Sequence, residues 1–251
     1  MDITLLSINT WKCDGDYTRR LPVLAAQLKE SGADIILCQE CFKTMNGDVD
    51  TLGYLSQQLD LPGYYVPARR KTRNEVDSYS GLGVLTRLKV KAEAALPLPS
   101  NAEDGGRMAQ LITLEVRPGT TIMVANIHLT HLRAEDLRLA QLRAVVEAVH
   151  ASPANIRLIG GDFNAQPGTQ AMEWLDQHAG DCYVLGDGKG PRATLGEAAI
   201  DHIYALPLAG SNQYPSFSEP GVVLNRGELG LFPSDHFGFR VQLLCPGFSI
   251  S

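Results

Sequence analysis

The apolar run Ile156–Ile159 leads directly into the sequence Gly160-Gly161-Asp162-Phe163-Asn164-Ala165-Gln166-Pro167-Gly168. The run is short and rich in branched residues, which indicates a buried strand. The glycine pair and the Pro-Gly turn predict an abrupt exit into a loop, where Asp162 and Asn164 present a carboxylate beside a carboxamide. Such a pair suits holding a metal-bound water against a phosphate, but Asp and Asn also satisfy backbone groups in ordinary turns. The stretch alone leaves both interpretations open.

Length and composition indicate one globular domain over residues 1–251. The chain is 44% hydrophobic and has no low-complexity tract or linker, so it can bury a sizeable core. Its formal net charge of -6 argues against a protein that coats nucleic acid with a basic face. An acidic enzyme can still meet phosphates through a bound cation, because the ion reverses the local sign of the site.

The five cysteines are an odd number without close pairing, which favours reduced and mostly buried thiols. The pair Cys38-Gln-Glu-Cys41 has redox-motif spacing, but its polar interior after a buried strand argues against a redox role. No cluster of Cys and His has the spacing of a zinc site. Residues 1–11 lack the pattern of a signal peptide, and no run reaches membrane-span length, so we expect a cytoplasmic protein.

Strand-like and helix-like segments alternate along the chain. Strands are predicted over Ile3–Ile8, Ile35–Cys38, Tyr64–Val66, Leu82–Thr86, Met108–Val116, Thr121–Leu129, Ile156–Ile159, Ile200–Leu206 and Phe237–Leu244. Helices are predicted over Thr18–Ser31, Asp50–Leu59, Ala134–His150 and Gln170–His178. Hairpins and strand–helix–strand units together favour an α/β or α+β layered sandwich, which gathers ligands at strand ends.

Polar residues stand at the ends of several of the predicted strands. They are Asn9, Gln39-Glu40, His128, Asp162 with Asn164, Asp201 with His202, and Asp235-His236. Each has a structural explanation when taken alone: a turn residue, a cap, a sheet histidine or a surface ion pair. Taken together, these explanations require six coincidences. We therefore expect the residues to form one shared site.

The same residues carry a resemblance to a known family. The sequence resembles the ordered motif set of the endonuclease/exonuclease/phosphatase superfamily through Asn9 with Trp11, Gln39-Glu40, Gly81-Leu82-Gly83-Val84-Leu85-Thr86, Asn126-Ile127-His128-Leu129, Gly161-Asp162-Phe163-Asn164, Ile200-Asp201-His202-Ile203 and Ser234-Asp235-His236. The match runs from residue 9 to residue 236. It implies a four-layer αββα sandwich, with two mixed β-sheets flanked by helices and a metal site at one edge.

The resemblance implies a metal site and a set of catalytic residues. Glu40 is the expected principal ligand of Mg²⁺, or of Mn²⁺ in its place, with Asn9 and Asp235 close by. Asp162 would align or deprotonate the attacking water, and Asn164 would donate to a non-bridging oxygen.

Two histidines and an arginine complete the expected site. His236 would contact the phosphate, oriented by Asp201, while His128 would assist the leaving oxygen. A histidine at position 128 resembles the pancreatic-deoxyribonuclease, sphingomyelinase and phosphoinositide-phosphatase branches. Arg107, after Gly105-Gly106, is a candidate substrate contact.

The predicted function is a divalent-metal-dependent phosphoesterase that hydrolyses a phosphodiester, or a phosphomonoester, by direct attack of water. One alternative is a phosphate-ligand binding protein that kept the fold but lost turnover. A calcineurin-like two-metal phosphatase would require further histidines, which the chain lacks. We expect a monomer, with nucleic acid, a phospholipid head group or an inositol phosphate as the substrate. The catalytic set does not choose among them.

Substrate specificity is expected to lie in loops. The candidates are Met45–Asp50, Ala68–Ser80, Asn101–Arg107 and Gly186–Leu195. The densest positive cluster, Arg69-Arg70-Lys71 with Arg73, is interpreted as a solvated loop in preference to a phosphate-backbone contact. Arg133, Arg138 and Arg143 are interpreted as the solvated face of a helix.

Overall fold

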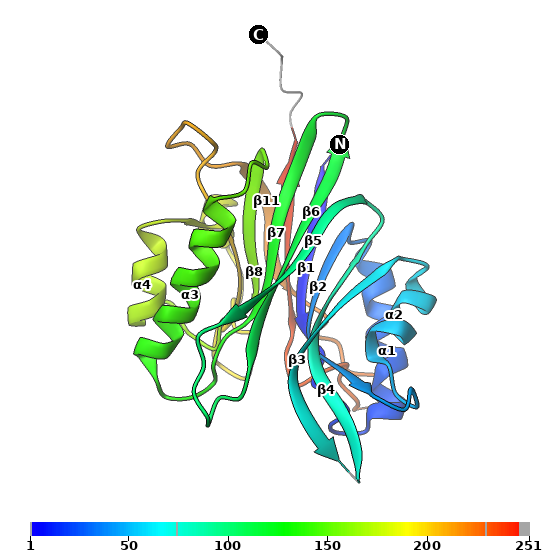
Figure 1. Cartoon of the computed structure of the whole chain (residues 1–251). Helices are drawn as coiled ribbons and strands as arrows, with labels where there is room; N and C mark the ends of the chain where they lie inside the picture. Colours follow the sequence, from blue (N-terminus) through cyan, green and yellow to red (C-terminus); the bar gives the residue numbers. More distant parts are fainter. Residues whose placement is uncertain (1, 74, 229, 246–251) are drawn as a thin grey trace.

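Two six-stranded sheets pack face to face between two outer layers of helices in the computed structural model, which describes residues 2–73, 75–228 and 230–245 (Figure 1). One sheet has the order β11-β12-β1-β2-β4-β3 and the other β5-β6-β7-β8-β10-β9. Each contains one parallel pair, β1 with β2 and β7 with β8, among antiparallel neighbours. The predicted four-layer sandwich with two mixed sheets is confirmed.

The strands of the first sheet are β1 (Ile3–Asn9), β2 (Ile35–Thr44), β3 (Gly63–Arg73), β4 (Val76–Thr86), β11 (Ser216–Val223) and β12 (Gly238–Leu244). Those of the second sheet are β5 (Lys89–Leu98), β6 (Arg107–Arg117), β7 (Thr120–His128), β8 (Ile156–Asp162), β9 (Gly180–Asp181) and β10 (Asp201–Ala205). The helices are α1 (Tyr17–Ser31), α2 (Thr51–Leu59), α3 (Glu135–His150), α4 (Gln170–Asp176) and α5 (Cys182–Leu185). In Figure 1, α1 and α2 cover the first sheet and α3 and α4 the second.

Strand β1 shows why the central strands read as continuous apolar runs. Ile3 and Leu5 point into the layer between the sheets, whereas Leu6 and Ile8 pack under α1. Both faces of the strand are buried, so alternation with polar residues is absent. The two sheets therefore pack against each other through a shared apolar layer.

Three strands were not predicted, β5, β9 and β11, and all three lie at sheet edges. β5 is almost wholly exposed and carries lysine, glutamate and alanine in place of an alternating apolar pattern. β11 contains Pro220 and a register irregularity against β12. Charged residues, proline and bulges are common on edge strands, because they block pairing with further chains. The apolar periodicity that reveals a central strand is therefore missing.

Three local predictions were wrong. Residues 68–80 were expected to form a loop, but residues 68–73 belong to β3 and residues 76–80 to β4, and Arg69 pairs with Ser80. The strand expected to end at Cys38 continues to Thr44. Arg138 was assigned to a solvated helix face, but it is buried and donates to the carbonyl oxygens of Thr130 and Leu132.

Candidate active site

The site lies at one edge of the sandwich, where strands of both sheets end together. Asn9 and Gln39 are register partners at the ends of their β1 and β2 pairing, and His128 and Asp162 are partners in β7 and β8. Asn9 Nδ2 donates to Asp162 Oδ2 over 3.0 Å and joins the two sheets at this point. A cleft of about 320 Å³ opens there, lined by Asn9, Trp11, Lys12, Glu40, Arg69, Lys71, His128, His131, Asp162, Asn164, Asp235 and His236.

Asp162 is the buried centre of this group. Its Oδ2 accepts from Asn9, and its Oδ1 accepts from the backbone N–H of Asn164 over 2.9 Å. Burial, together with the nearby charge of Asp201, raises the pKa of Asp162 to about 7, against the opposing pull of His236. A carboxylate with this pKa can both hold and release a proton near neutrality.

His236 is fixed from behind by a carboxylate. Its Nδ1 is 2.8 Å from Asp201 Oδ2, and its Nε2 is 3.9 Å from Asp162 Oδ2. Burial lowers the pKa of His236, but Asp201, Asp162 and Asp235 outweigh burial and raise it to about 9. The ring is therefore an imidazolium at neutral pH. The predicted pairing of Asp201 with His236 is present.

His128 has the opposite electrostatics. Its Nε2 lies 3.5 Å from Asp162 Oδ2. Burial first, and then the positive charges of Arg107 and His236, hold the pKa of His128 well below its ordinary value. The two histidines beside Asp162 thus differ in charge at neutral pH, one neutral and one cationic.

Glu40 reaches the cleft through a β-bulge. The pairing of β2 with β4 shifts between Cys38 and Cys41, and Glu40 takes a positive φ of 56°. Its Oε1 accepts from Lys12 Nζ over 2.8 Å. A bulge re-aims a side chain without ending the strand, so β2 continues while Glu40 turns toward the site.

The donor set at Glu40 fits a hard divalent cation. Asp235, from the loop before β12, lines the same cleft, and its pKa is raised by burial and by the negative charge of Glu40. Two carboxylates beside the amide of Asn9 are oxygen donors of the kind Mg²⁺ selects. Lys12 supplies the counter-charge at Glu40 here.

A second grouping of possible ligands fits a cation less well. Asp162, Asp201 and His236 offer ligand atoms within 4.8 Å of one another. In this group Nδ1 of His236 is already bonded to Asp201, and the imidazolium would repel an added cation. The oxygen donors on the Glu40–Asp235 side of the cleft fit a cation better.

Asn164 and Arg107, two residues predicted to act on the substrate, form hydrogen bonds within the protein. Asn164 Nδ2 donates to the carbonyl oxygen of Leu129 over 3.0 Å, which uses one of its two amide hydrogens. Arg107 lies beneath the cleft and is buried. It bonds Asp104 through Nε at 2.9 Å, donates to the carbonyl oxygen of His128 at 3.3 Å, and meets His131 Nδ1 at 2.9 Å.

Five residues of the cleft were not included in the predicted site: Trp11, Lys12, Arg69, Lys71 and His131. The spacing His128-Leu-Thr-His131 offered one signal for the last of them. Arg69 and Lys71 were recognised as a cluster but interpreted as solvated. Their place on one face of a strand could be seen only once residues 63–73 were known to be extended.

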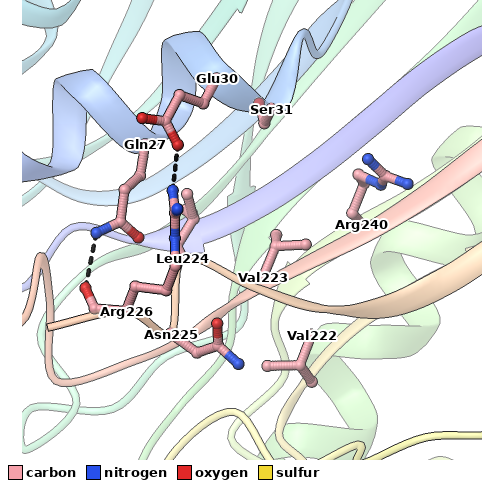
Figure 2. A pocket seen from close by; sticks show the side chains of 9 residues that line it. All are labelled: Gln27, Glu30, Ser31, Val222, Val223, Leu224, Asn225, Arg226 and Arg240. Atoms are coloured by element: carbon pink, nitrogen blue, oxygen red, sulfur yellow. Dashed lines mark hydrogen bonds and ion pairs between the residues drawn. The ribbon is translucent and has the colours of Figure 1, made fainter.

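Two further hollows help to delimit the site. One, of about 430 Å³, adjoins the cleft and is mostly apolar, with Trp11, Phe232 and Phe237 in its wall. The other, of about 220 Å³, lies between α1 and the segment 222–226 (Figure 2). Its polar groups bond to one another, Gln27 to the carbonyl oxygen of Arg226 and Arg226 to Glu30, and none of the predicted site residues lines it.

Comparison with known proteins agrees with this geometry. The family model described as "Endonuclease/Exonuclease/phosphatase family" matches residues 6–236. The chain belongs to the endonuclease/exonuclease/phosphatase family. Members of this family are generally hydrolases that act on phosphoester bonds. The model spans every residue of the predicted site, from Asn9 to His236.

Solved structures of the endonuclease/exonuclease/phosphatase family share the fold at low identity. A family protein from Leptotrichia buccalis C-1013-b has a TM-score of 0.78 at 20% identity, covering 97% of this chain and 100% of that one. A humanized D. rerio TDP2 has a TM-score of 0.78 at 17% identity, covering 97% and 99%. TDP2 from C. elegans has a TM-score of 0.69 at 16% identity, covering 98% and 76%. No curated protein matches the sequence significantly.

No helix in the described part of the chain combines the length and apolar character needed to cross a bilayer.

Proposed function

We propose that this chain is a Mg²⁺-dependent phosphoesterase that cleaves a phosphodiester, or a phosphomonoester, by direct attack of water. The observation that carries the proposal is the buried Asp162, which Asn9 and Asn164 hold between a cationic and a neutral histidine. Phosphoester hydrolysis needs a proton acceptor for water and donors for the phosphoryl oxygens. All of these groups line one cleft.

The metal belongs at Glu40 and Asp235, with Asn9 beside them. When bound, the ion neutralises charge on the phosphate and polarises its oxygens. Mn²⁺ meets the same oxygen donors and can replace Mg²⁺. Lys12 would then have to yield its contact with Glu40, or share it.

The protein side chains handle the protons. Asp162 aligns the attacking water and accepts its proton, as a pKa of about 7 permits. His236, kept cationic by Asp201, donates to a non-bridging oxygen on which charge accumulates. Asn164 adds a donor through its second amide hydrogen. His128 assists the departing oxygen.

The organic part of the substrate is less constrained. The apolar hollow beside Asp235 offers contact area for a base, a ring or an acyl chain, so nucleic acid, an inositol phosphate and a lipid head group remain candidates. A protein that binds phosphate ligands without turnover is the second candidate function. No residue of the catalytic set is replaced, and no observation favours that alternative.

Hydrolysis of bis(p-nitrophenyl) phosphate and p-nitrophenyl phosphate with Mg²⁺, and then with excess chelator, tests the proposal. We expect activity only with metal, and losses of about 1,000-fold in kcat for Asp162→Asn and His236→Gln. His178→Gln is the matched control, because His178 is exposed and stacks on Trp174 away from the cleft. Activity that survives chelation, or that persists in both site variants, would refute the proposal.

A further inference from the structure

The rim of the cleft carries positive charge that the proposed reaction does not use. Residues 69–71 run through strand β3, and successive side chains of a strand point to opposite faces. Arg69 and Lys71 line the cleft. Arg70, between them, has a 65% exposed side chain and forms an ion pair with Asp77. Thr72 also bonds Asp77, over 2.8 Å. The alternation therefore places Arg69 and Lys71 on the cleft face of the strand and Arg70 on its outer face.

The positive charge of Arg69 is not balanced locally. Lys12 is paired with Glu40 and Arg107 with Asp104. In the described part of the chain no carboxylate lies within ion-pair distance of Arg69. Its charge acts across the rim. Burial, the charge of Arg107 and the charge of Arg69 together lower the pKa of His131. An arginine held near like charges in an acidic protein favours an anionic ligand at that place.

His131 adds a neutral donor to the same rim. Arg107 Nη2 lies 2.9 Å from His131 Nδ1. A guanidinium can only donate, so Nδ1 accepts and the ring proton is on Nε2. Asp104 holds Arg107 in place, and Thr130 Oγ1 and Gln141 Nε2 in turn donate to Asp104 over 2.9 Å each. A buried polar network thus fixes the tautomer of a histidine that lies at the cleft mouth.

We propose that Arg69, Lys71 and His131 form a second anion site, which binds a phosphate group of the substrate other than the one that is cleaved. The inference rests on the proposed function for the identity of the first phosphate. It names the substrate class: an ester that carries two phosphates joined by a short spacer. A nucleotide strand and an inositol polyphosphate both have this chemistry. A fork-shaped guanidinium, an ammonium group and an N–H donor match a phosphate group in charge and in hydrogen-bonding geometry.

Titration calorimetry in excess chelator tests the site without turnover, because the proposed hydrolysis requires Mg²⁺. The probes are thymidine 3′,5′-bisphosphate against thymidine 5′-monophosphate, and inositol 1,4-bisphosphate against inositol 1-phosphate. We expect the wild-type protein to bind one bisphosphate about 10- to 100-fold more tightly than its monophosphate, the gain expected from charged hydrogen bonds. The pair that shows the preference identifies the spacer as nucleoside or inositol.

Variants test whether residues on the cleft face of β3 cause the preference for a bisphosphate. Arg69→Gln and Lys71→Gln should each reduce the affinity ratio by about tenfold, and His131→Phe should reduce it by severalfold. Arg70→Gln is the matched control, one residue away on the outer face, and should leave the ratio unchanged. A wild-type ratio near one for both pairs would overturn the inference, and so would equal losses in Arg69→Gln and Arg70→Gln.

Hydrolysis assays separate this inference from the proposed function. A bisphosphate preference in a protein that cleaves no ester with Mg²⁺ would leave the anion site in place and refute the enzyme. Cleavage of simple diesters together with a wild-type ratio near one would leave the enzyme in place and refute the anion site.

Discussion

At the scale of single residues, the charged groups around each histidine ring set its charge state in the cleft. His236 and His128 both lie near Asp162, but only His236 has a carboxylate on its far nitrogen. His128 has the positive charges of Arg107 and His236 close by. One histidine is therefore kept charged and the other neutral, and neither state follows from the residue type alone.

Replacing Asp201 with Asn should lower the pKa of His236. Asp201 contributes most among the three carboxylates that raise this pKa to about 9, and a neutral amide removes both its charge and its favourable acceptor. We expect a pKa that moves toward the ordinary value of about 6.5 in the metal-free protein, measured by NMR titration of the ring. The ring signals of His178, which lies outside the cleft, serve as the internal control. A value for His236 that stays near 9 would contradict this assignment.

The pair of His236 and Asp201 also predicts the direction in which the free energy of unfolding changes with pH. The pKa of His236 in the folded state lies above its unfolded value, so the stabilisation is complete below about pH 6.5 and is lost as the pH rises through about 9. Asp201→Asn should therefore cost more free energy of unfolding at pH 6 than at pH 10. Urea denaturation of both proteins at the two pH values measures the difference.

Gly161→Ala should destabilise the fold. Gly161 has a φ of 144°, and a Cβ there would lie 2.0 Å from the carbonyl oxygen of Ile127. We expect a loss of about 3 kcal/mol or more in the free energy of unfolding, measured with urea. Gly190→Ala is the control, because a Cβ at Gly190 meets nothing within 4 Å. Equal stability of the two variants would show that the backbone of β7 moves aside at little cost.

At the scale of elements, helix α1 anchors the loop that carries Lys12. Arg20, on the first turns of the helix, is buried, and its guanidinium donates to five backbone carbonyl oxygens, those of Thr10, Trp11, Lys12, Asp14 and Pro233. It therefore joins the loop after β1 to the segment that leads to Asp235. Only a planar group with five N–H donors can satisfy this arrangement.

Arg20→Lys should loosen both segments. A lysine has three donors without the fork, so buried carbonyl oxygens are left unpaired at a cost of about 3 kcal/mol in the free energy of unfolding. Arg19→Lys, at a 66% exposed side chain paired with Asp16, should change it by less than about 0.5 kcal/mol. Chemical denaturation of the two variants measures the difference. Losses of equal size would show that the carbonyl contacts of Arg20 contribute little.

At the scale of the whole molecule, the site is a junction of the two sheets. Asn9 and Glu40 come from one sheet, His128 and Asp162 from the other, and Asp235 from the loop before β12. A cation bound there would join parts of the chain that are distant in sequence. Metal binding should therefore be coupled to the stability of the entire fold.

Mg²⁺ should raise the melting temperature. At ten times its Kd the ion contributes about 1.4 kcal/mol to the folded state. For a chain of this size that corresponds to a shift of about 3 to 6 °C by scanning calorimetry. Glu40→Gln should abolish the shift, whereas Glu147→Gln, on the exposed face of α3, should retain it. A full shift in Glu40→Gln would exclude Glu40 as a ligand.

The amino-acid sequence by itself determined the layered fold, the central strands and the members of the proposed catalytic set. These properties depend on local patterns, because a strand buried on both faces needs a continuous apolar run and a strand end needs a polar exit. Asp162 and Asn164 could be singled out because glycine and proline mark that exit directly.

Only the tertiary structure decided which residues line the cleft and which support them. Arg107 and Arg69 are both arginines in polar segments, yet one is bonded beneath the cleft and the other lies on its rim. The bulge that turns Glu40 inward and the edge strand that separates Arg69 from Arg70 depend on pairing with β4. Pairing partners lie tens of residues away, and burial and charge follow from them, so no local pattern in the sequence contains this information.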